Sequence, residues 1–250
     1  MLCKLATRRA FLAASGLAVM GITGLSSSPT APTLYATPAG GRAPETSSPP
    51  TATQTVPTAQ QALQQLLDGN RRFERGETAA LRQAIAQKQT PLAIVFSCAD
   101  SRVPPELVFD QHLGDLFTIR TAGQVIDDAA LGTIEYGIAE LAIPLLVVLG
   151  HERCGAVQAA LEAVDHHAVA PGHIQYLVDY IRPSVLKAQG QGNARLSSAI
   201  HNNIVYTVHA LSSRSTIIGA AVQTGTLTIV GGDYDLDAGT VRIILSSIKR

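Results

Sequence analysis

The sequence predicts an α/β fold with a mostly parallel central β-sheet, flanking helices, an antiparallel last strand and an N-terminal helical arm. Short runs that are apolar throughout alternate with stretches of helical length, as in doubly wound parallel sheets. The chain has 250 residues, of which 46% are hydrophobic and 15% are charged, so one sizeable core can form. Because the formal net charge is zero and no long basic run follows the first residues, we do not expect nucleic-acid binding.

The first 39 residues predict an export signal. Lys4, Arg8 and Arg9 precede an uncharged, mildly apolar run over residues 10–25, which is too short for a membrane span. Residues 7–12 (TRRAFL) resemble the twin-arginine motif of proteins that are exported already folded. We therefore expect a periplasmic protein, or one of the thylakoid lumen if the cell has one, with no stable membrane span after processing. An ordinary secretory signal and an uncleaved anchor are the alternatives.

Residues 40–57 predict a disordered linker, and residues 58–250 predict one globular domain. The linker is rich in Pro, Ser and Thr, so it cannot bury enough apolar surface to offset the entropy of ordering. The domain opens with a helix over residues 58–73. Its apolar side chains follow helical spacing and Thr58 is suited to the N-cap; the apolar residues are Leu63, Leu66, Leu67 and Phe73.

The rest of the domain divides into predicted strands and helices. Strands are expected where apolar runs are short, at residues 92–97, 116–120, 145–150 and 227–230. Helices are expected between them, at residues 128–141, 154–164, 174–188 and 199–214. A last run at residues 241–245 follows a turn at residues 237–239, so we expect it to pair antiparallel with the strand before it.

Candidate metal ligands follow two of the predicted strands directly. Cys98 comes after the run at residues 92–97, and His151 and Cys154 come after the run at residues 145–150. The carboxyl ends of strands line the ligand crevice in open α/β sheets, so the three side chains are expected to meet. Two thiolates and an imidazole suit Zn²⁺, and three protein ligands leave a fourth position open, as in catalytic sites. The alternatives are cysteines packed in the core, or a Cys98–Cys154 disulfide.

Four motifs in order resemble the β-class carbonic anhydrases. They are residues 97–106 (SCADSRVPPE), 114–123 (GDLFTIRTAG), 132–136 (GTIEY) and 150–156 (GHERCGA), supported by residues 66–73 (LLDGNRRF) and 234–241 (YDLDAGTV). The resemblance covers residues 58–250. It implies a zinc enzyme that reversibly hydrates carbon dioxide to bicarbonate and a proton through a zinc-bound hydroxide.

The resemblance also assigns roles to individual residues. Cys98, His151 and Cys154 match the zinc ligands of the family. Asp100 and Arg102 match its catalytic dyad, with Asp100 as a fourth zinc ligand in a closed state. Residues that match the substrate pocket are Gln89, Phe117, Ala122, Tyr136 and Gly155, of which Tyr136 matches a side chain supplied by the partner subunit. The resemblance therefore implies a homodimer or higher homo-oligomer.

The chain departs from the family pattern at three positions. Thr121 and Gln124 stand where members commonly have Asn, at the edge of the pocket. Val95 stands where bicarbonate-regulated members carry Trp, so that regulation is not expected here. Two other functions stay open at this stage. The same fold and metal could hydrolyse carbonyl sulfide or carbon disulfide, and a scaffold with a Cys98–Cys154 disulfide would have no activity.

Overall fold

The computed structural model describes residues 59–76 and 78–246. The predicted export signal, the predicted linker and the predicted N-cap Thr58 lie outside these residues. Among the helices that are described, none is long and apolar enough to cross a membrane.

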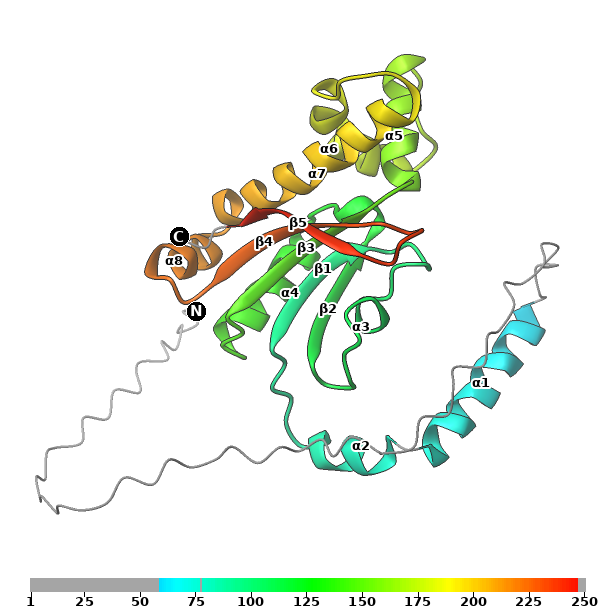
Figure 1. Cartoon of the computed structure of the whole chain (residues 1–250), viewed down its shortest axis with the longest axis vertical. Helices are drawn as coiled ribbons and strands as arrows, with labels where there is room; N and C mark the ends of the chain where they lie inside the picture. The colour runs from blue at the N-terminus through cyan, green and yellow to red at the C-terminus, as the bar shows by residue number, and fades with distance from the viewer. Residues whose placement is uncertain (1–58, 77, 247–250) are drawn as a thin grey trace, which may run out of the picture. The chain divides into compact units, whose positions relative to one another are not determined.

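Five strands form one sheet in the order β2-β1-β3-β4-β5 (Figure 1). Their bounds are β1 Ala93–Cys98, β2 Leu116–Thr121, β3 Leu145–His151, β4 Thr228–Tyr234 and β5 Val241–Ser246. Neighbouring strands from β2 to β4 pair parallel, and β5 pairs antiparallel with β4. The predicted fold class, a mostly parallel sheet with an antiparallel last strand, is therefore confirmed.

The sheet residues alternate between two apolar clusters on its opposite faces. Ile94, Phe96 and Cys98 of β1 belong to the larger cluster, which also contains buried residues of the later helices, whereas Val95 belongs to the smaller one. This alternation follows from the two-residue period of a strand. The smaller cluster is closed by loop residues and by α3, which spans only Pro105–Val108. The helices are thus divided unequally between the two faces.

All four helices predicted between the strands are present. They are α4 Asp128–Ala139, α5 Gly155–Asp165, α6 Ile174–Leu186 and α7 Gly192–Arg214. Helix α7 begins at Gly192, well before the predicted start at residue 199. The prediction missed its first turns because they are polar and carry little apolar periodicity. Three α-helices and one 3₁₀ helix were not predicted: α2 Ala79–Ile85, α3, α8 Thr216–Thr224 and the 3₁₀ helix η1 Ala122–Gln124. Helix α8 follows α7 across Ser215 alone, whose hydroxyl oxygen accepts a hydrogen bond from the Ile218 N–H at 3.1 Å.

The predicted first helix is α1, Ala59–Arg75. None of its residues is buried in the single chain. Four large apolar side chains on it are exposed: Leu63, Leu66, Leu67 and Phe73. An apolar stripe of this kind normally packs against another surface, so α1 presents an apolar face that the described part of this chain does not cover.

Candidate metal centre

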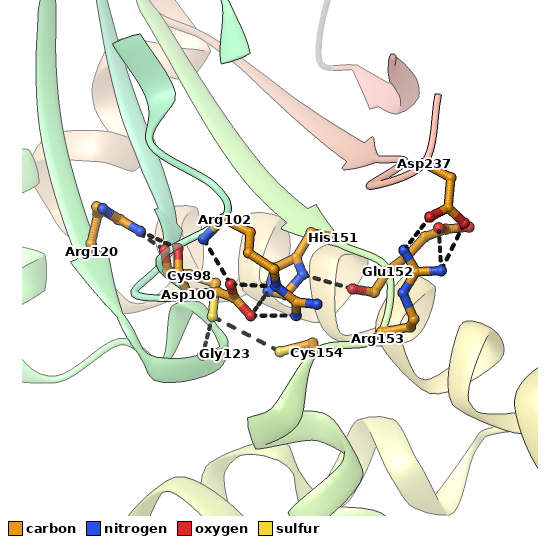
Figure 2. A network of polar contacts seen from close by, with 10 residues as sticks. All are labelled: Cys98, Asp100, Arg102, Arg120, Gly123, His151, Glu152, Arg153, Cys154 and Asp237. Carbon is orange, nitrogen blue, oxygen red and sulfur yellow. Dashed lines mark hydrogen bonds and ion pairs between the residues drawn. The ribbon is translucent and has the colours of Figure 1, made fainter. Parts of the chain in front are cut away.

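Three side chains that can bind a metal meet where two central strands end. Cys98 is the last residue of β1, His151 is the last residue of β3, and Cys154 is the N-cap residue of α5. Because β1 and β3 are parallel neighbours, their carboxyl ends lie side by side (Figure 2). The two sulfurs and one imidazole nitrogen lie within 4.8 Å of one another, and all three residues are buried.

The spacing of the two sulfurs fits a shared metal ion. Cys98 Sγ and Cys154 Sγ are 3.9 Å apart, and both cysteines are free thiols. A disulfide would need a separation of about 2.0 Å. Two bonds of about 2.3 Å from a tetrahedral zinc ion would place the sulfurs about 3.8 Å apart. The donor set therefore fits a tetrahedral cation such as Zn²⁺, and the structure does not contain the disulfide considered as an alternative.

The His151 ring has one nitrogen ready to bind a metal. Its Nδ1 lies 2.8 Å from the Glu152 carbonyl oxygen. Because a carbonyl oxygen only accepts hydrogen bonds, Nδ1 carries the proton and Nε2 keeps a lone pair. Nε2 is buried and has no hydrogen-bond partner within the described residues. The contact between Nδ1 and the Glu152 carbonyl thus fixes the tautomer that a histidine needs in order to bind a metal through Nε2.

The two thiols interact strongly when no metal is bound. A hydrogen bond from the Cys154 thiol lowers the pKa of Cys98 to about 4, although burial acts in the opposite direction. The His151 ring and the Gly123 N–H lower it further. The same contact with Cys98, together with burial, raises the pKa of Cys154. One proton is therefore shared by the pair, and Cys98 is the thiol that ionises first.

Asp100 lies beside the three donor atoms but is held by Arg102. The guanidinium donates from Nε to Oδ1 at 2.9 Å and from Nη2 to Oδ2 at 2.7 Å, and the Arg102 backbone N–H also donates to Oδ1. These hydrogen bonds hold the pKa of Asp100 well below its usual range. Asp100 Oδ2 is 3.9 Å from His151 Nε2, so the carboxylate is close to the position that a metal would occupy (Figure 2).

Two further arginines fix the loops that carry these groups. Arg120 of β2 donates from Nε to the Cys98 carbonyl at 3.0 Å and from Nη2 to the Asp100 carbonyl at 2.5 Å. Arg153 donates from both terminal nitrogens to Asp237 at 2.8 Å, which ties the loop after β3 to the turn between β4 and β5. Arg120 was not predicted as a site residue, although it lies inside the motif at residues 114–123.

The predicted pocket residues divide into two groups. Ala122 precedes Gly123, whose N–H donates to Cys98 Sγ at 3.3 Å, and Gly155 follows Cys154 directly. These two residues therefore border the cluster of donor atoms. In a single chain, the other three predicted pocket residues do not border this cluster. Gln89 is exposed between α2 and β1, and the Phe117 and Tyr136 rings stack on each other with centroids 6.3 Å apart.

The strand register shows how far the aromatic pair is from the donor atoms. Cys98 pairs with Thr121 of β2, and Phe117 lies four residues earlier on the same strand. At about 3.3 Å per residue, Phe117 is about 13 Å from the end of the strand that carries the donors. Tyr136 is 49% exposed, whereas Phe117 is partly buried and packs against the larger apolar cluster, so the tyrosine is the outer member of the pair.

The residues that depart from the family pattern differ in how well the structure accommodates them. Thr121 Oγ1 donates to the Val125 carbonyl at 2.8 Å. Gln124 is 2% exposed with φ of 45°, and its Oε1 has no partner among the residues that the structure describes. Val95 is 1% exposed within the smaller apolar cluster, so it is part of the core.

Comparison with known proteins identifies the family. The model of the carbonic anhydrase family matches residues 93–241. A carbonic anhydrase of Mycolicibacterium smegmatis is 43% identical over 188 residues, which are 73% of this chain and 91% of that protein. Because the match spans the fold and the donor residues, the chain belongs to the carbonic anhydrase family.

Solved structures agree on the class of carbonic anhydrase. The β-carbonic anhydrase of Coccomyxa, solved in complex with acetazolamide, superposes with a TM-score of 0.64 at 26% identity, over 73% of this chain and 86% of that one. Tetrameric β-carbonic anhydrases of Sordaria macrospora share the fold, with a TM-score of 0.68 at 19% identity, over 74% of this chain and 98% of that one. The fold is therefore that of the β class.

The thiol pair predicts how the metal-free protein responds to pH. Because the hydrogen bond from Cys154 lowers the pKa of Cys98, the ultraviolet absorbance of one thiolate should persist well below the ordinary thiol pKa of about 8.5 and into mildly acidic pH. Replacing Cys98 with Ser should abolish this absorbance. Cys154→Ala should move its loss toward the ordinary thiol pKa of about 8.5, because the strongest hydrogen bond to Cys98 is then gone. A metal-free wild type with no thiolate absorbance near neutral pH would contradict this prediction.

Proposed function

We propose that this protein catalyses the reversible hydration of carbon dioxide to bicarbonate and a proton, with Zn²⁺ held by Cys98, His151 and Cys154. The observation that carries the proposal is the buried group of two sulfurs and one imidazole nitrogen within 4.8 Å, at the ends of adjacent strands. Membership of the carbonic anhydrase family supports the reaction. The sulfur spacing and the single available nitrogen of His151 support the metal.

The chemistry needs a cation with one open position. Bound zinc supplies Lewis acidity that makes a water molecule acidic near neutral pH, an effect for which a carbonic anhydrase is itself the standard example. Three protein donors are found together, and a tetrahedral ion has four positions. Two of the donors are thiolates, which offset the charge of the cation, so we expect activity to rise toward mildly alkaline pH.

Asp100 supplies a fixed hydrogen-bond acceptor beside the metal position. Arg102 holds its pKa well below the usual range, so the carboxyl is ionised at every pH at which the enzyme would work. An ionised carboxylate only accepts hydrogen bonds. Asp100 can therefore orient a hydrogen-bond donor that approaches the open position, and it takes up no proton itself. Its charge would be lost only in strong acid, below the ordinary aspartate pKa of about 3.9.

Arg102 also decides where the Asp100 carboxylate points. The pair makes two side-chain hydrogen bonds, and Oδ2 is only 3.9 Å from His151 Nε2. Without the guanidinium, a metal ion would be the best remaining cation for this carboxylate. We infer that Arg102 keeps Asp100 from occupying the open position, so the pair acts as a gate.

We also propose that the active unit is a homodimer or a higher homo-oligomer. Phe117 and Tyr136 match pocket residues of the family, but in a single chain they stack on each other about 13 Å along the strand from the donor atoms. The apolar face of α1 is likewise exposed. Both features are accounted for if a second copy covers α1 and receives the aromatic pair at its own metal centre.

Export through the twin-arginine route is a further proposal, which rests on residues 7–12 and on the chemistry of the site. Two thiols that cross a membrane unfolded could be oxidised to a disulfide before any metal arrives. Transport of the folded protein avoids this, because the metal is bound in the cytoplasm first.

Metal content is the first test of the proposed function. The purified protein should hold about one zinc ion per chain and should hydrate carbon dioxide in stopped-flow assays. His151→Ala or Cys154→Ser should remove zinc and activity together and lower the thermal midpoint, because metal binding is coupled to folding. His173→Ala, which changes an exposed histidine, serves as the matched control and should change none of these. Full activity in metal-free protein would overturn the proposal.

The gate is tested by removing Arg102. Arg102→Ala should keep its zinc but lose activity by at least about tenfold, with the remainder shifted to more alkaline pH, where hydroxide competes better with Asp100. Asp100→Ala should also keep zinc and lose rate, while staying open to small anions. The control is Arg195→Ala, which breaks a comparable pair with Asp165 (2.7 Å) on the surface. Wild-type activity of Arg102→Ala near neutral pH would rule out the gate.

Mixing two inactive chains tests the shared site. Tyr136→Ala keeps its own metal ligands, and His151→Ala keeps its aromatic pair. If Tyr136 serves the partner, random mixing of the two should restore about a quarter of the wild-type activity, because half of the dimers contain one intact composite site. Mixing Tyr136→Ala with the Tyr136→Ala, His151→Ala double variant is the control and should restore nothing. A fully active monomer in sedimentation would show that no partner is needed.

The export route is tested at the two arginines. Changing Arg8 and Arg9 to Lys keeps the positive charge and should leave a folded, active precursor inside the cell. Cell fractionation followed by an activity assay would measure this. Normal export of the double variant would favour the general secretory route instead.

A further inference from the structure

A buried asparagine connects the helical layer to the metal centre. Asn203 of α7 is 0% exposed and lies between the apolar core residues Ile200 and Ile204. A buried amide is costly unless it is hydrogen-bonded. Here both ends of the side chain have partners: Nδ2 donates to the Gly123 carbonyl at 2.9 Å, and Oδ1 accepts from Ser184 Oγ at 3.4 Å. The Gly123 carbonyl can only accept, so the amide nitrogen must face it.

Gly123 is the residue between this asparagine and the first cysteine. It has φ of 67°, in the left-handed region, and a Cβ there would come within 2.8 Å of the Ile181 side chain. Its N–H donates to Cys98 Sγ at 3.3 Å. One peptide segment is therefore held from two sides, by the sulfur at its N–H and by Asn203 at its carbonyl. Glycine is the most permissive residue of the backbone, so these contacts must fix its orientation.

We propose that Asn203 is a positioning residue of the metal centre: it holds the Gly123 segment so that the N–H donates to the Cys98 sulfur. This inference rests on the proposed zinc site and deepens it. A hydrogen bond to a ligating thiolate withdraws electron density from the sulfur, so it adjusts how strongly the sulfur donates to the metal. Asn203 touches neither metal nor substrate and acts only through Gly123.

The neighbouring asparagine provides a matched control. Asn202 Nδ2 donates to the Ser184 carbonyl at 3.2 Å, so it also links α7 to α6, but this hydrogen bond does not involve Gly123. Asn202→Leu and Asn203→Leu each replace an amide by an apolar side chain of similar size on the same helix. Only the second change removes the bond to the Gly123 carbonyl.

Cobalt-substituted full-length protein gives a readout that a purely structural role would not move. In Asn203→Leu the thiolate-to-cobalt charge-transfer band should shift to longer wavelength, because a sulfur without its N–H donor is a stronger electron donor. Chelator competition should still show cobalt bound about tenfold or more weakly, because the loss of a fixed orientation around Cys98 outweighs the stronger donation by its sulfur. Asn202→Leu should keep the wild-type band and affinity, even if its thermal midpoint falls. An unchanged band and affinity in folded Asn203→Leu would overturn the inference.

A second variant keeps the inference testable if Asn203→Leu does not fold. Ser184→Ala keeps the asparagine but removes the hydroxyl that orients its Oδ1, so the band should shift in the same direction by a smaller amount. No shift in Ser184→Ala would then count against the inference. Failure of the proposed function would look different, because the wild-type protein itself would take up no cobalt and show no thiolate charge-transfer band.

Discussion

The parallel pairing of β1 with β3 is the constraint on which the rest of the site depends. The register runs from Ile94 opposite Leu146 to Ser97 opposite Leu149, so the strand ends that carry Cys98 and His151 are neighbours. A shift of one residue in β1 would turn Cys98 to the opposite face of the sheet. The buried residues on both faces oppose such a shift, because it would exchange the larger and smaller apolar clusters. The packing of the core and the position of Cys98, the first candidate metal ligand, are thus fixed by the same contacts.

Hydrogen-bond donors around the candidate metal-binding atoms compensate the negative charge of this region. An ionised Cys98 and an ionised Asp100 lie close together in a largely buried place, which would be unfavourable without compensation. Arg102 neutralises the carboxylate, the Gly123 N–H contacts the sulfur, and Arg120 binds the carbonyl groups of the loop between them. Arg102 lies on the loop after β1 itself, whereas Arg120 and Gly123 come from β2 and the turn directly after it, so this loop is held both from within and by the neighbouring strand. This pre-arrangement is what a metal centre needs, since the ligands do not have to be collected when the ion binds.

A single chain forms the candidate metal site but not the whole predicted pocket around it. Its candidate metal ligands come together fully, whereas Tyr136 and the apolar face of α1 remain exposed. In the proposed homo-oligomer, a pocket divided in this way would couple catalysis to assembly, because the reacting atoms and part of the apolar wall would belong to different copies. Stability and activity would then both depend on protein concentration.

The sequence by itself determined the central strands, the main helices and the residues that could bind a metal. Those features are encoded locally: apolar runs of strand length predict β1 and β3, and the motifs beginning at Cys98 and His151 follow them directly. Short helices such as α3 and α8 were missed, because one turn after Pro104 or a break at Ser215 leaves little periodic pattern. Only the tertiary structure decided the remaining contacts. Asn203 and Gly123 are 80 positions apart along the chain, and Arg120 and Cys98 are 22 apart. The distance of Phe117 from the donor atoms likewise depends on strand register. Contacts of this kind arise from how elements pack, and no local pattern of residues records them.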